Sequence, residues 1–131
     1  MTTMERKDKS RGGRPWSFDR DQAIETAMRL FWRSGYEGVS IGDLTREIGV
    51  APPSLYAAFG SKAGLYKEAL DRYEEEFGSL DLASVDKATT LAEAVRALLT
   101  GAVRAVTDPD RESGCMISSG TVACHPDHEP I

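Results

Sequence analysis

Apolar side chains recur three or four residues apart along most of this chain, which is the spacing of one face of an α-helix. The pattern predicts an all-α protein in which residues 78–87 form a loop or a short irregular link. A further apolar segment begins at residues 114–117. The helices predicted from this pattern and from its flanking residues cover residues 19–34, 40–48, 53–59, 61–77 and 88–107.

The segment from Ser40 to Lys62 carries the strongest local signals. It predicts two short helices joined by a tight turn, followed by the start of a longer helix. Ser40 is a good N-cap, and Asp43 places a negative charge near the same helix N-terminus. Gly49 directly follows the first short helix, and glycine suits the left-handed conformation that commonly ends a helix.

Two adjacent prolines set the start of the second short helix. Pro52 precedes a proline and is expected to be extended, so Pro53 becomes the first helical residue, where a missing N–H costs nothing. Leu55 and Phe59 lie four residues apart and are expected to point inward. The residues expected to point outward or to the flanks are Ser54, Tyr56, Ala57 and Ala58. Such a helix suits insertion into a DNA major groove, and an ordinary helical hairpin is the alternative.

The stretch 49–62 resembles the TetR family of bacterial transcriptional regulators. That family shows the run Gly-Val-x-x-x-(Ser/Thr)-Leu-Tyr-x-x-Phe-x-(Ser/Asn)-Lys, which this stretch matches in residue type and spacing. Upstream residues that match the family's first helix and following turn are Ala27, Leu30, Phe31, Gly35, Tyr36, Ser40 and Ile41. The resemblance covers about residues 19–70. It implies a sequence-specific DNA-binding regulator, a repressor that a small-molecule effector releases.

The resemblance also implies partners. These are a double-stranded DNA operator, an unidentified effector and a second copy of the chain, if the C-terminal part suffices for pairing. A dimer would place two recognition helices about one DNA turn apart, or a multiple of it. Two alternatives remain open: a constitutive DNA-binding fragment without effector response, and a helical module that binds protein.

Individual DNA contacts follow partly from the resemblance and partly from side-chain chemistry. In the family, the residues matching Ser54, Tyr56 and Lys62 touch the DNA backbone. The chain departs from the family where alanines stand in place of polar or aromatic residues, so Arg46 becomes the best candidate for reading a guanine. A phosphate contact or a solvated side chain is the alternative for Arg46. The complete candidate DNA-binding set is Arg14, Ser40, Arg46, Pro53, Ser54, Tyr56, Ala57 and Lys62.

The net charge of −5 is unevenly distributed. Residues 1–67 hold 11 Lys/Arg and 8 Asp/Glu, a net charge of +3, whereas residues 68–131 hold 5 and 13, a net charge of −8. A basic front and an acidic back fit a DNA-binding module joined to a second module. We therefore expect a flexible basic arm at 1–16, a helix-turn-helix domain at 17–62, and a connecting helix with a partial ligand-binding or dimerisation domain at 63–131.

Other classes of function find little support in the sequence. No catalytic set, phosphate loop or paired-carboxylate motif appears, so an enzyme is not expected, nor is a cofactor. Cys115, Cys124, His125 and His128 match no common zinc spacing, and no metal site is predicted. The chain lacks an apolar run of membrane-spanning length, and a cytoplasmic protein is expected. The apolar face of residues 88–107 is predicted to be core, or core plus one wall of a ligand pocket.

Overall fold

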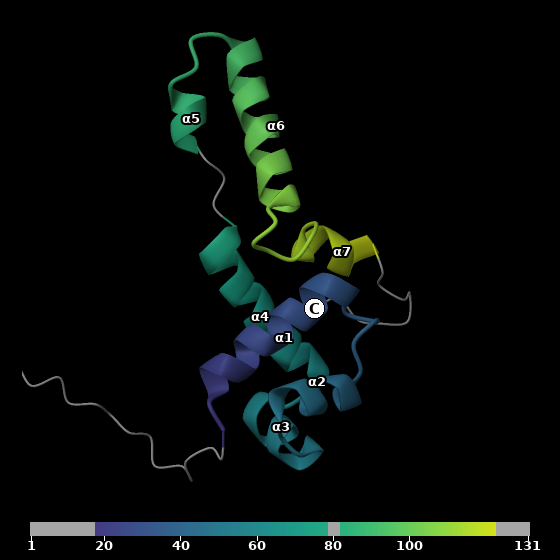
Figure 1. The fold of residues 1–131 in the computed structure, drawn as a ribbon. Coiled ribbons are helices and arrows are strands. Elements are labelled where there is room, and N and C mark those ends of the chain that lie inside the picture. The colour runs from purple at the N-terminus through teal and green to yellow at the C-terminus, as the bar shows by residue number, and fades with distance from the viewer. Residues whose placement is uncertain (1–17, 79–81, 123–131) are drawn as a thin grey trace, which may run out of the picture.

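A computed structural model describes residues 18–78 and 82–122 of the chain (Figure 1). All regular secondary structure in this part is helical, which confirms the all-α prediction. The predictions for residues 1–16, including Arg14, and for Cys124, His125 and His128 concern residues outside the described ones. The helices are α1 (Arg20–Ser34), α2 (Ile41–Ile48), α3 (Pro52–Phe59), α4 (Lys62–Phe77), α5 (Leu82–Asp86), α6 (Leu91–Thr107) and α7 (Met116–Val122).

The core joins α1 to α2, α3, α4 and the short helix α7. Helix α1 packs against α4, α2 and α7, so it is the central support of this unit (Figure 1). A second feature of the core is an aromatic group in which the Trp32 ring lies edge-on to Tyr73 at 4.8 Å and near Phe77 at 5.1 Å. The largest fully buried side chains are Phe31, Met28, Leu44, Leu55, Leu65, Met116 and Val39.

Two predicted helix starts were wrong, and one short helix was not predicted. Helix α3 begins at Pro52 rather than Pro53, with Ala51 as the extended N-cap. The clash that disfavours helix before a proline involves the N–H and the Cβ of the preceding residue, and Pro52 lacks the first of these, so the clash is reduced. Helix α6 begins at Leu91 rather than at residue 88, because Thr90 caps it in a capping box with Glu93. The predicted loop 78–87 contains α5, which packs against α6; that tertiary contact has no signal in local spacing.

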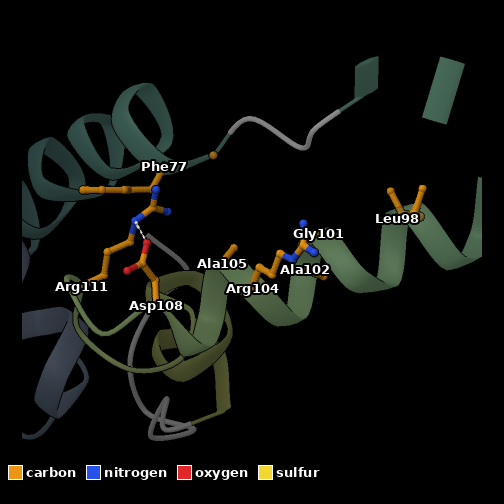
Figure 2. Close-up of a pocket in the computed structure, with 10 residues that line it drawn as sticks. Phe77, Leu98, Gly101, Ala102, Arg104, Ala105, Asp108 and Arg111 are labelled. Atoms are coloured by element: carbon orange, nitrogen blue, oxygen red, sulfur yellow. Dashed lines mark ion pairs between the residues drawn. The ribbon is translucent and has the colours of Figure 1, made fainter. Parts of the chain in front are cut away.

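Helix α6 does not form core in the described part of the chain. None of its residues is buried, and Leu91 and Leu99 are 80% and 60% exposed. The core interpretation of this face was therefore wrong. Leu98 and Ala102 instead line an open cavity of about 300 Å³ between α6 and the end of α4 (Figure 2). The core part of the alternative interpretation is therefore wrong as well, and its other part, one wall of a ligand pocket, stays a prediction.

The turn between α2 and α3 depends on Gly49, which has φ 80° in the left-handed region. We predict that Gly49→Ala lowers the free energy of unfolding by about 1 kcal/mol, because an L-residue is strained there. Gly42→Ala, inside α2, is the matched control. Its added Cβ would meet only Ser40 Oγ at an ordinary 3.6 Å, so stability should rise by about 0.5–1 kcal/mol. Urea unfolding measures both variants, and changes of the same sign would contradict this account of the turn.

Candidate nucleic-acid interface

Helix α3 presents a small exposed surface at one end of the molecule. Leu55 and Phe59 are buried against the core, as predicted, whereas Tyr56 is 46% exposed. Helix α3 contacts both α2 and α4, and it lies at the end of the molecule opposite α5 and α6 (Figure 1). Pro53 and Ala57 are also exposed, and Ser54 is half-buried. The arrangement is a short helix braced from two sides, with its outer face open.

Ser40 lies at the start of α2 and acts as its N-cap. Its hydroxyl accepts a hydrogen bond from the Asp43 N–H at 3.0 Å and donates one to the Asp43 carboxylate at 2.8 Å. The Ser40 N–H donates to the same carboxylate at 2.9 Å, which completes a capping box. These hydrogen bonds hold the pKa of Asp43 below its ordinary value. The hydroxyl therefore has a structural role already, and a DNA contact by Ser40 stays a prediction.

Arg46 lies in the last turn of α2, next to α3. Its side chain is 70% exposed, and its guanidinium forms an ion pair with Asp43 at 3.3 Å within the same helix. An exposed pair of this kind contributes little to stability, so it does not prevent the guanidinium from reaching DNA. A guanine contact by Arg46 stays a prediction, with a phosphate contact or a solvated side chain as its alternative.

Lys62 is the first residue of α4, and its side chain lies against an aromatic ring. Its ammonium nitrogen is 4.3 Å from the centroid of the Tyr36 ring. Partial burial lowers the pKa of Lys62, and the nearby carboxylates of Glu37 and Asp43 act in the opposite direction. Ser61 caps the helix by accepting a hydrogen bond from the Gly64 N–H at 2.9 Å. The contact with Tyr36 was not predicted, because the two residues are 26 positions apart and belong to separate elements.

The candidate residues in the described part therefore lie on three adjoining elements: the ends of α2, the exposed face of α3 and the start of α4. No cluster of three or more potential metal ligands occurs among the described residues. None of the described helices combines the length and apolar character needed to cross a membrane. The chemistry available at this surface is that of hydroxyls, one guanidinium and one ammonium, all of which can donate hydrogen bonds to phosphate.

Comparison with known proteins agrees with this geometry. Residues 23–69 match the family model described as "Bacterial regulatory proteins, tetR family". The chain is 38% identical to the HTH-type transcriptional repressor ComR of Escherichia coli (strain K12) over 124 residues, which make up 94% of this chain and 59% of ComR. It is also 38% identical to the HTH-type transcriptional repressor BdcR of the same organism over 110 residues, which make up 82% of this chain and 55% of BdcR.

A solved structure is similar as well. It is the TetR family transcriptional regulator CifR, a cysteine mutant complexed with 26bp double-strand operator DNA, with a TM-score of 0.73 and 41% identity. The match covers 87% of this chain and 59% of that one, so the chain spans about six tenths of the length of these relatives. By its matched domain, and by its agreement with these regulators over most of its length, the chain belongs to the tetR family of bacterial regulatory proteins.

Proposed function

We propose that the chain is a sequence-specific DNA-binding transcriptional regulator of the cytoplasm, and that it acts as a repressor rather than as an enzyme. The observation that carries the proposal is the exposed face of α3, which includes Tyr56. This helix contacts α2, which carries Arg46, and α4, which begins at Lys62. A braced helix of this kind fits the major groove. The operator-bound state of CifR and the repressor role of ComR support the same conclusion.

The proposal extends to how the chain is divided and assembled. Residues 17–62 would bind DNA, and residues 63–131 would connect this domain to a partial ligand-binding and dimerisation domain. In a dimer, two copies of α3 would reach major grooves about one helical turn apart, or a multiple of it, on a near-palindromic operator. Occupation of the operator would block transcription sterically.

The open cavity between α4 and α6 is our candidate for the effector site. Figure 2 shows the Phe77 ring beside the Arg111 guanidinium, which lies 4.8 Å from the ring centroid and forms an ion pair with Asp108 at 3.2 Å. Arg104 also lines the cavity. Because Phe77 is the last residue of α4, a molecule bound here would act directly on the helix that begins at Lys62.

The segment after α6 gives a second route from this cavity to the DNA-binding unit. The Trp32 indole N–H donates a hydrogen bond to the Gly114 carbonyl at 3.0 Å, and Arg33 forms an ion pair with Glu112 at 2.7 Å. Trp32 and Arg33 both lie in α1, which is the helix that supports α2 and α3. A shift at the end of α6 would therefore reach α1, and we expect an effector to act by changing the spacing of the two recognition helices.

The test is the solution mass of the 131-residue chain with and without a duplex that carries its own upstream intergenic region. We expect a dimer that binds this duplex more tightly than a scrambled duplex of the same length. A monomer with weak, salt-sensitive and non-specific binding would favour a DNA-binding fragment without effector response. No binding to any duplex at low salt would contradict the proposed function and favour a module that binds protein.

A further inference from the structure

The contact between Lys62 and Tyr36 joins two elements that flank the recognition helix. Tyr36 lies in the turn between α1 and α2, and Lys62 opens α4. The Tyr36 ring is itself held in place, because it stacks on Phe31 at 6.0 Å and meets Tyr66 edge-on at 5.0 Å. Phe31 and Tyr66 are buried. The ring against which the Lys62 ammonium lies is therefore a fixed part of the core edge.

The first turn of a helix is not a favourable place for the positive charge of Lys62. A cation in the first turn is disfavoured by the helix dipole, and the capping role belongs to Ser61. The side chain is also partly buried, which disfavours the charged form. The carboxylates of Glu37 and Asp43 counteract the effect of burial. The Tyr36 ring, 4.3 Å from the ammonium nitrogen, adds to this, since an aromatic face attracts a cation, and more strongly where water is partly excluded.

We propose that Tyr36 is a positioning residue for DNA binding, and that its ring holds the ammonium of Lys62 ready to contact a DNA phosphate; this inference rests on the proposed function. A free lysine side chain must lose much rotamer freedom when it binds one phosphate. With the ammonium already held over the ring, part of that loss occurs on folding instead of on binding. The ammonium has three N–H donors, so the side turned away from the ring keeps donors for a phosphate oxygen.

A double-mutant cycle tests the inference on the intact 131-residue chain. The four proteins are the wild type, Tyr36→Leu, Lys62→Met and the double variant, and the measurement is the dissociation constant for the upstream duplex at fixed salt. Tyr36→Leu should weaken binding about three- to tenfold in the wild-type background. It should have less than about a twofold effect once Lys62 is methionine, because the charge on which the ring acts is gone.

Tyr36→Phe is the conservative variant, since it keeps the ring and removes only the hydroxyl. It should bind within about twofold of the wild type. If Phe behaved like Leu, the hydroxyl rather than the ring would be the active group, and the inference would be overturned. Equal weakening by Tyr36→Leu in both backgrounds would overturn it as well, because that result means a general loss of packing.

Proton NMR of the free protein provides a measurement that no unfolded variant can obscure. The methylene protons nearest the Lys62 ammonium should be shifted upfield by the Tyr36 ring in the wild type and in Tyr36→Phe. Absence of that shift would overturn the inference even if DNA binds normally. Failure of the wild type to bind any duplex would instead overturn the proposed function, and the positioning role with it.

Discussion

Leu55→Ala is expected to lower the free energy of unfolding by about 2–5 kcal/mol, measured by urea denaturation. Leu55 is fully buried on the inner face of α3, so the substitution removes packed methyl groups and leaves a cavity. The large effect follows from the small size of the unit. Helix α3 has eight residues, and only Leu55 and Phe59 are buried in it. The substitution therefore truncates one of the two side chains that pack this helix against the core.

Tyr56→Ala is the matched control, one residue further along the same helix. Tyr56 is 46% exposed, so its truncation should change the free energy of unfolding by no more than about 0.5 kcal/mol. DNA binding should respond in the opposite way, with Tyr56→Ala weakening it while the fold persists. Loss of stability at Tyr56 and not at Leu55 would mean that α3 is rotated about its axis, and the proposed DNA-binding face would then be wrong.

Helices α2 and α3 were predicted well from the sequence because the signals in this part of the chain are local. The spacing of Leu55 and Phe59 gave the inner face of α3, and Ser40 and Gly49 marked the ends of α2. Each of these features acts within four or five residues, through a cap, a turn or one helical repeat. The family resemblance added the candidate DNA contacts, which stay predictions, because spacing alone could not distinguish a DNA-binding helix from an ordinary helical hairpin.

Contacts between distant segments could not be predicted in the same way. The hydrogen bond from Trp32 to the Gly114 carbonyl joins residues 82 positions apart. Tyr36 meets Lys62 although the helices α2 and α3 lie between them in the chain. Such pairs depend on how helices pack against one another, and the spacing of apolar residues along the sequence does not predict them. Helix α6 shows a related limit: its spacing identified an apolar face correctly, but spacing cannot say what covers that face.

Lys62→Met is expected to weaken binding to operator and to unrelated duplexes by the same factor, about tenfold at low salt. Methionine has an unbranched side chain like lysine and removes the charge, and Lys62 is only partly buried, so the fold should persist. Removal of one phosphate contact should also reduce the steepness of log K against log salt by about 0.9 for each copy bound. Fluorescence anisotropy over a salt series measures both quantities.

Lys67→Met is the control for the charge itself. Lys67 is an exposed lysine on the same helix, more than one turn beyond Lys62 and outside the proposed interface. Its loss lowers the net charge equally, so any non-specific electrostatic effect should appear in both variants, and only Lys62→Met should change the salt slope. A phosphate contact positions the protein without reading sequence. If Lys62→Met instead altered which operator is preferred, Lys62 would be reading a base, and its assignment as a phosphate contact would be wrong.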